Sequence, residues 1–344
     1  WYKHQGMLRY QGKFQKPHQS AIRSLLTRGV IYLNYLLSIA RYFLTHWSSE
    51  APETCRLVDD EKPIVVTGAS SDLGQAVLAE LRQESRVIAV SRNKRFPETL
   101  GNEKWFHWSY LEKVPADDFP GARAWLALSP VWAAPDMARA LGRRGVVQRI
   151  IALSSTSITG KADTADSAEQ EVVRQLLDGE QGLLRWGRDN ASDVTICRAS
   201  MIYGGKSNQN IAFIQRMIRW FRFFPMVSQG NGMRQPVHID DLAAAVHTLL
   251  GKSELPDDTY VLAGGEQLSY RHMIERIFHA MNRRERFWVV PEQHFKRGVD
   301  MLSHVPGMGF LNREMISRME KNLVYDLEPA RRDFEYAPGM FRPD

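Results

Sequence analysis

Residues 63–81 constrain the fold of this chain more than any other segment. The apolar run IVV at 64–66 is typical of a buried β-strand; it stops at Gly68, and a helical pattern begins by Gln75. A strand, a glycine-containing turn and a helix therefore follow one another directly. Such a turn points free backbone N–H groups and the positive end of the helix dipole at a pyrophosphate, which predicts a dinucleotide site.

The predicted site departs in one respect from the glycine fingerprint of dinucleotide-binding turns. The fingerprint has three glycine positions, and Ser71 occupies the middle one. The residues of the turn that we expect to contact the cofactor are Thr67, Gly68, Ser70, Ser71, Asp72, Leu73 and Gly74.

A second predicted strand ends in Ser91 and Arg92, at the distance where this kind of fold contacts the adenosine ribose. An acidic residue there would accept hydrogen bonds from the ribose hydroxyls of NAD, and the chain has none at that point. Arg92, with Lys94 and Arg95 nearby, instead offers cations suited to a 2′-phosphate. We therefore expect NADP, with NAD as the alternative cofactor. A solvated cationic loop is the competing structural interpretation.

The composition is ordinary for an ordered, soluble enzyme of one large or two smaller domains, with 344 residues, 44% of them hydrophobic and 24% charged. Two cysteines, Cys55 and Cys197, are too few for a disulfide framework or a cysteine-based zinc site. The histidines show no HExxH spacing, so no metal is expected. A reducing compartment, the cytoplasm, fits this pattern.

The net charge of +6 is concentrated at the N-terminus. Residues 1–54 hold seven Lys/Arg and two Glu, a net charge of +5. The remainder holds 38 basic and 37 acidic residues, a net charge of +1. This distribution argues against a nucleic-acid groove on the folded body. The apolar run at 29–40 is shorter than the ~20 residues that span a bilayer. Residues 21–47 are expected to form an amphipathic helix, which either lies on the inner face of the membrane or packs on protein: the body, a partner or a second subunit of a homodimer.

Residues 55–62 are predicted to be a linker, and strand and helix patterns alternate from residue 63 onward. The predicted strands are 65–67, 87–90, 105–108, 124–128, 149–153 and 194–198. This alternation predicts an α/β fold with a Rossmann-type doubly wound parallel sheet, in a nucleotide-binding part at about 63–200. A smaller substrate lobe is expected at about 201–344, with helices at 211–224, 240–250 and 269–281.

Four separated motifs have the order and spacing of one protein family. They are TGASSDLG at 67–74, LSSTSITG at 153–160, RASMIYG at 198–204 and RQPVHIDDLAAAV at 234–246. Over residues 63–340 the chain resembles extended short-chain dehydrogenases/reductases of the NAD-dependent epimerase/dehydratase type. The resemblance implies an oxidoreductase or epimerase that exchanges hydride between a nicotinamide dinucleotide and a nucleotide-linked sugar.

The resemblance also implies roles for individual residues. Thr156, beside Ser155, matches the hydroxyl that polarises the reacting oxygen of the substrate, and a hydroxyl can donate to a developing alkoxide. Arg234 matches an arginine that binds the substrate diphosphate. Three further residues are candidates for contact with the substrate, although turn or core packing explains them as well: Tyr203, Asn208 and Asn210.

One departure from the family pattern concerns catalysis. The family's general base is a tyrosine followed four positions later by a lysine, expected here at about 167–174, where the chain has neither. Glu169 or Glu171 is the candidate base, and Lys161 or Arg174 the candidate contact to the nicotinamide ribose; a solvated helix face is the competing interpretation.

Two functions of different classes therefore stay open: an NADP-dependent oxidoreductase or epimerase, and a catalytically inactive dinucleotide-binding scaffold or sensor. A tyrosine or carboxylate brought into the site from the C-terminal lobe would favour the enzyme.

Overall fold

The computed structural model of the chain describes residues 62–82, 85–93, 102–109, 121–143, 147–205, 209–226, 229–252, 255–289 and 319–343. The expected N-terminal extension at 1–54, with its amphipathic helix, and residues 55–61 of the expected linker lie outside these ranges. Among the described residues, no helix has both the length and the apolar character needed to span a bilayer.

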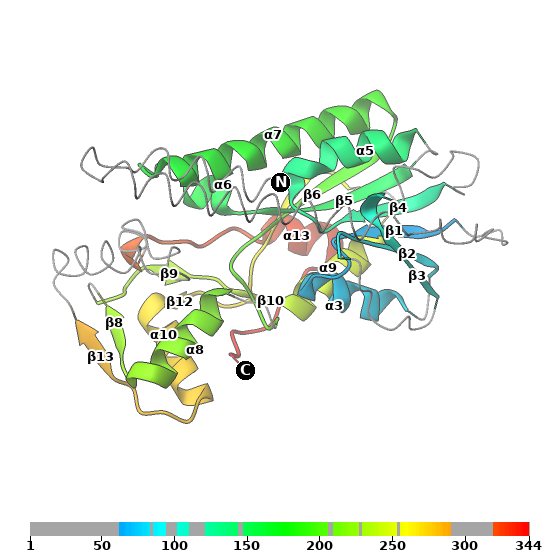
Figure 1. Ribbon diagram of the computed structural model, residues 1–344. Helices are drawn as coiled ribbons and strands as arrows, with labels where there is room; N and C mark the ends of the chain where they lie inside the picture. Colours follow the sequence, from blue (N-terminus) through cyan, green and yellow to red (C-terminus); the bar gives the residue numbers. More distant parts are fainter. Residues whose placement is uncertain are drawn as a thin grey trace, which may run out of the picture. The chain divides into compact units, whose positions relative to one another are not determined.

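Seven parallel strands form the central sheet, in the order β11-β6-β5-β4-β1-β2-β3 (Figure 1). They are β1 (Ile64–Thr67), β2 (Val87–Ser91), β3 (Glu103–His107), β4 (Ala122–Ala127), β5 (Val147–Ser155), β6 (Asp193–Ala199) and β11 (Thr259–Leu262). The strand order reverses between β1 and β4, and ligands of such sheets bind in the crevice at this point. The Rossmann-type doubly wound sheet expected from the sequence is confirmed.

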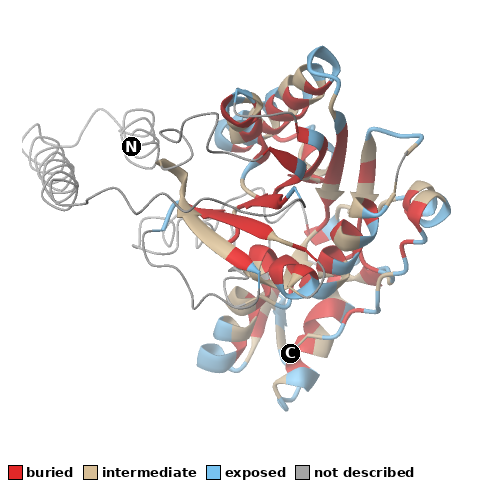
Figure 2. Cartoon of the chain, turned by 90° about the vertical axis from the view of Figure 1, so that its right-hand side faces the viewer, coloured by how far each residue is buried: buried red, intermediate tan, exposed pale blue. Residues whose placement is uncertain are grey.

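Helices cover both faces of the sheet, which explains why its strands are nearly continuous apolar runs. The helices α3 (Asp72–Leu81) and α9 (Ile239–Leu250) pack against each other on one face, and α5 (Ala134–Gly142) and α7 (Ser167–Asp189) on the other. All four residues of β1 are buried, and Val66 pairs with Ala89 on one side and Leu126 on the other. In Figure 2 the buried residues accordingly occupy the strands and the inner sides of the helices.

The chain returns to the sheet after residue 200. Strand β11 extends the sheet by pairing with β6, and α13 (Glu328–Phe334) packs near β11. Leu242, Leu262 and Phe334 share one hydrophobic core with Val66. The part of the sequence expected to form the substrate lobe therefore contributes one strand, β11, to the sheet and two helices, α9 and α13, that pack in the core beside it.

The smaller lobe is built around α8 (Gln209–Phe221) and α10 (Tyr270–Ala280), whose buried faces form a second hydrophobic core. In the part of the chain that the structure describes, three two-stranded sheets accompany these helices. They pair β7 (Ile202–Tyr203) with β10 (Val237–His238), β9 (Met233–Arg234) with β12 (Leu268–Ser269), and β8 (Phe224–Met226) with β13 (Phe287–Val289).

The helix expected to continue to residue 224 ends earlier. Arg222 adopts a left-handed conformation with φ of 59°, and the next residues form β8 rather than a last helical turn. The pairing of β8 with β13 is a long-range contact, and it outweighs the local helical pattern of the sequence.

Candidate active site

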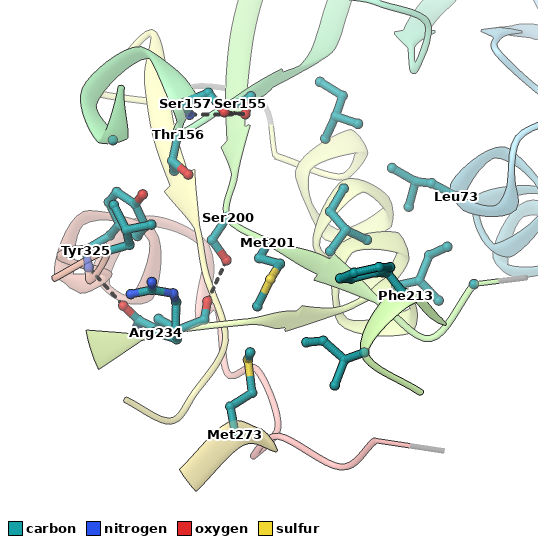
Figure 3. Close-up of a pocket in the computed structure, with 18 of the residues that line it drawn as sticks. Leu73, Ser155, Thr156, Ser157, Ser200, Met201, Phe213, Arg234, Met273 and Tyr325 are labelled. Carbon is teal, nitrogen blue, oxygen red and sulfur yellow. Dashed lines mark hydrogen bonds between the residues drawn. The ribbon is translucent and has the colours of Figure 1, made fainter. Parts of the chain in front are cut away.

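A cavity of about 930 Å³ lies at the carboxyl ends of the central strands, where the smaller lobe meets the sheet (Figure 3). The turn after β1, the end of β5, the segment after β6, and helices α8 and α10 all contribute to its wall. The position of the cavity and the residues of its wall agree with a ligand site, because the largely apolar wall carries a few converging polar groups.

The turn after β1 is tight and depends on two glycines. Gly68 has a φ of 78°, and a Cβ on it would lie 2.7 Å from the Leu128 carbonyl group. A Cβ on Gly74 would lie 2.6 Å from the carbonyl oxygen of Ala69, so both glycines are required by close backbone packing. Ser71, at the middle fingerprint position, caps α3: its hydroxyl accepts from the N–H of Gly74 at 3.0 Å.

The cavity reaches this turn, since Ser71, Asp72 and Leu73 are part of its wall. Thr67 differs from its neighbours. It is buried, and its hydroxyl accepts a hydrogen bond from the Trp125 indole at 3.1 Å, so the structure places it in the core below the turn.

The two segments expected to bind the adenosine half of a dinucleotide lie together. Ser91 is buried at the end of β2, and its hydroxyl donates to that of Ser70 at 2.8 Å. The N–H of Asn93 donates to Ser91 at 2.9 Å. Arg92 between them is exposed, while Lys94 and Arg95 lie outside the described residues.

Thr156 stands at the end of β5, immediately before the one-turn helix α6 (Ser157–Gly160). Its N–H donates to the carbonyl of Ala199 at 3.0 Å, and its side chain lines the cavity. Ser155 also lines the cavity, but its hydroxyl donates to Ser157 at 3.0 Å and thus stabilises the turn into α6. In Figure 3 the Thr156 side chain points towards the side of the cavity that holds Arg234 and Tyr325.

Lys161 follows α6 and lines the same cavity, whereas Glu169 does not. The ammonium group of Lys161 forms an ion pair with Glu169 at 3.1 Å, and the hydroxyl of Thr164 donates to the other carboxylate oxygen at 2.9 Å. Glu169 is buried, so it is not part of a solvated helix face. It also does not face the cavity, as a catalytic base would. Its geometry suits a residue that positions Lys161.

Arg234 is a buried cation in the cavity wall. Its Nη1 donates to the carbonyls of Met233 and Lys321, each at 2.8 Å, and its guanidinium lies 5.1 Å from the centre of the Tyr270 ring. These contacts keep the planar guanidinium at the cavity, as the proposed diphosphate contact requires.

Tyr325 is a polar residue of the cavity that the sequence motifs did not reveal. It comes from the C-terminal segment, which runs beside β9: the N–H of Leu323 donates to Met233 at 2.8 Å. The backbone N–H of Tyr325 donates to the buried Gln235 side chain at 2.9 Å. Its hydroxyl lies 3.3 Å from where a Cβ on Gly160 would stand, next to Lys161.

Other ionisable groups near the sheet are held in non-catalytic environments. Tyr260 donates to Asp333, and burial together with this bond raises its pKa to about 12. Burial also raises the pKa of the Tyr336 hydroxyl, which donates to the Ala263 carbonyl. Cys197 is buried in β6, which raises its pKa to about 12 and keeps the thiol protonated. No cluster of His, Cys, Asp and Glu suited to a metal ion occurs in the described ranges.

Of the three remaining candidates, the structure describes only the side chain of Tyr203, which is not part of the cavity wall. Tyr203 is buried, its hydroxyl accepts from the N–H of Arg342 at 3.1 Å, and its ring packs on Phe341. Asn208 lies outside the described residues, and the side chain of Asn210, at the start of α8, is likewise not described.

The sheet topology and the added lobe give the chain the fold of solved epimerase structures. Residues 133–263 match the sequence model of the NAD dependent epimerase/dehydratase family. This match confirms, over these residues, the resemblance inferred from the motifs.

The named relatives are distant in sequence. A UDP-glucose 4-epimerase of Vibrio cholerae is 19% identical over 201 residues, which are 56% of this chain and 59% of that relative. The epimerase Mth375 of Methanothermobacter thermautotrophicus superimposes with a TM-score of 0.61 at 14% identity, over 81% of this chain and 88% of that one. The UDP-glucuronic acid 4-epimerase of Bacillus cereus, in complex with UDP-glucuronic acid and NAD, has a TM-score of 0.58 at 16% identity, over 81% and 94%.

Proposed function

We propose that this chain is an NAD(P)-dependent oxidoreductase or epimerase acting on a nucleotide-linked sugar. The observation that carries the proposal is Tyr325, which the C-terminal segment brings into the cavity that Thr156 and Lys161 also line. The family's tyrosine and lysine are missing from α7, so a hydroxyl supplied from another element restores the kind of group that a proton transfer needs.

The residues present fit a dinucleotide. Close backbone packing at Gly68 and Gly74 fixes the turn at the start of α3, where a pyrophosphate is expected, and Ser70 and Ser91 stand together where the adenosine ribose is expected. A bound nicotinamide would exchange hydride with a carbon of the sugar. The Bacillus cereus structure contains this pair of ligand types, a UDP-sugar and NAD.

The proton chemistry is assigned to residues of this chain. When the sugar carbinol is oxidised, the hydroxyl proton passes to the phenolate form of Tyr325 as the hydride leaves the carbon, and in the reverse reduction the Tyr325 phenol returns that proton to the oxygen. Thr156 donates a hydrogen bond to the same oxygen and stabilises its developing negative charge. Lys161, held by Glu169, supplies a positive charge in the same wall and a donor for the nicotinamide ribose.

A binding protein without turnover is the second candidate, favoured by the absence of tyrosine and lysine from α7. Incubation with NADP or NAD and a series of UDP- and dTDP-hexoses separates the two. Cofactor reduction or a changed sugar, followed by absorbance and NMR, identifies the enzyme. Calorimetric binding of both ligands without conversion identifies the scaffold, and failure of every nucleotide-sugar to bind contradicts the substrate class.

We expect NADPH to bind more tightly than NADH, because Arg92 is exposed directly after β2 and the sequence has no acidic residue at 90–97 to bind ribose hydroxyls. Arg92→Asp should reverse the preference by removing a charge-assisted phosphate contact, at a cost of ~1.5–3 kcal/mol for NADPH. Calorimetric titration of both cofactors decides the question. Equal affinities, or tighter NADH binding in the unmutated protein, would show that the arginine is only a solvated side chain.

We expect Arg234→Ala to weaken UDP-sugar binding by ~10- to 100-fold while NADPH affinity stays unchanged, because a charged hydrogen bond to phosphate contributes about that much. Arg234 also bonds the Lys321 carbonyl, so thermal unfolding must be compared in parallel. Arg234→Lys is the matched variant: it keeps the charge but loses the planar pair of donors, and should recover only part of the affinity. Unchanged binding of UDP by both variants would contradict the assigned role.

A further inference from the structure

In Figure 1, β13 and the neighbouring α8 lie in the smaller lobe, away from the central sheet. Large aromatic side chains are exposed on both elements. Trp220 is 63% exposed and Phe221 49% at the C-terminal end of α8, and Trp288 is 60% exposed on β13. Phe223 connects the last two of these rings, with its ring centre 6.0 Å from that of Phe221 and 5.5 Å from that of Trp288, and Trp220 adjoins Phe221 in the sequence. We call these four residues the aromatic patch. Exposed apolar patches of this kind usually mark interaction surfaces.

Exposed arginines come from the same two elements as the aromatic patch. Arg219 and Arg222 alternate with its aromatic residues at the end of α8. Arg283, Arg284 and Arg286 are exposed in the turn before β13, and the carbonyl of Arg286 accepts from Phe224 at 2.8 Å, next to Phe223. The pairing of β8 with β13 therefore gathers cations from two distant parts of the sequence.

The part of the sequence that contains α8 and β8 carries no negative charge. No aspartate or glutamate occurs in the sequence between Asp193 and Asp240, a stretch that includes all of α8 and β8. Glu285 lies among the arginines of the turn, and it pairs with His279 at 2.5 Å. The net charge of residues 55–344 is only +1, but positive charge is concentrated locally around the aromatic patch.

We propose that the aromatic patch and its five arginines dock the protein on an anionic lipid surface. Tryptophan and phenylalanine rings suit the boundary between headgroups and acyl chains, and arginines around them bind anionic headgroups. Trp220 points outward at the end of α8, while Phe213 and Ile214 on the same helix line the cavity. Docking through this surface therefore does not involve the residues of α8 that line the cavity.

Charge disfavours two other occupants. A second copy of this chain docked through the same surface would bring its five arginines against these five. Residues 1–54 of the chain carry a net charge of +5 and would be repelled as well. An anionic bilayer complements both features of the surface, its cations and its exposed rings.

Co-sedimentation of the full chain with vesicles tests the proposal. The protein should bind phosphatidylcholine/phosphatidylglycerol vesicles, and bind pure phosphatidylcholine weakly. Trp220→Ser combined with Trp288→Ser should weaken binding by at least ~tenfold, because it removes most of the apolar area that enters the interface. Trp132→Ser is the matched control, since Trp132 is 45% exposed but lies in the short helix η2 (Val131–Ala133), outside the patch.

A second variant does not depend on the tryptophans. Arg283→Gln with Arg284→Gln changes only an exposed turn, and it should weaken binding and reduce its dependence on salt. Equal binding of the unmutated protein and both patch variants would overturn the proposal, because residues 21–47 would then account for attachment. No binding to anionic vesicles, or patch-dependent binding of an oligonucleotide or a second copy instead, would also overturn it. Nucleotide binding should be unchanged in every variant.

Discussion

Replacing Tyr325 with phenylalanine is expected to lower kcat for sugar oxidation by about 10²- to 10⁴-fold, the usual contribution of a positioned acid–base group. The variant keeps the ring, and the backbone bond from residue 325 to Gln235 does not involve the hydroxyl. Binding of free UDP should therefore stay unchanged. Affinity for the complete UDP-sugar should fall by ~2- to 10-fold, as expected for one lost hydrogen bond. Steady-state kinetics and calorimetry measure the two effects separately.

Tyr203→Phe is the matched control for this experiment. Tyr203 is buried, its hydroxyl is bonded to the backbone near residues 340–342, and it does not line the cavity. Its loss should lower thermal stability slightly and leave kcat unchanged. If Tyr325→Phe retained full turnover, another group would have to move the proton and the proposed role of Tyr325 would be wrong. Equal losses in both variants would point to a general structural effect.

Substitution of Gly74 by valine should abolish dinucleotide binding. Even the first side-chain atom would lie 2.6 Å from the Ala69 carbonyl oxygen, so the backbone of the phosphate-binding turn must move. Overpacking of this kind costs ~1–3 kcal/mol of folding stability, which a core of this size can tolerate. Calorimetry with NADPH and thermal unfolding distinguish a folded protein without cofactor affinity from an unfolded one.

Gly251→Ala provides the control for that substitution. A Cβ at Gly251 has its nearest contact at 3.5 Å, an ordinary van der Waals distance, and the residue lies at the end of α9 away from the turn. NADPH affinity should be unchanged in this variant. Retained affinity in a folded Gly74→Val protein would mean that the turn after β1 is not the phosphate site.

Local hydrophobic patterns in the sequence were sufficient to predict most of the central sheet. Six of the seven central strands were expected to within a few residues, because an α/β sheet covered on both faces leaves apolar runs that stop at recognisable turns. The seventh, β11, was not singled out, because its four residues carry too short a pattern to distinguish a strand from a loop. Pairing with β6 decides its conformation.

The start of α9 illustrates a similar limit at a single residue. Asp240 has a side chain suited to capping the helix, but His238 does so: its Nδ1 accepts from the N–H of Asp240 at 3.2 Å. Both residues have suitable acceptors, and the choice depends on where β10 ends. Pairing of β10 with β7 sets that boundary.

The sequence by itself determined the turn proposed to bind phosphate, because the strand, Gly68, the Ser71 cap and the helix are adjacent in the chain and their geometry follows from backbone sterics. The tertiary structure decided the side of the cavity proposed to transfer the proton, and the aromatic patch. Tyr325 reaches the cavity only because its segment runs beside β9, and Trp288 reaches Phe223 only because β13 pairs with β8. Such contacts join segments tens of residues apart, and no local pattern of residues specifies them.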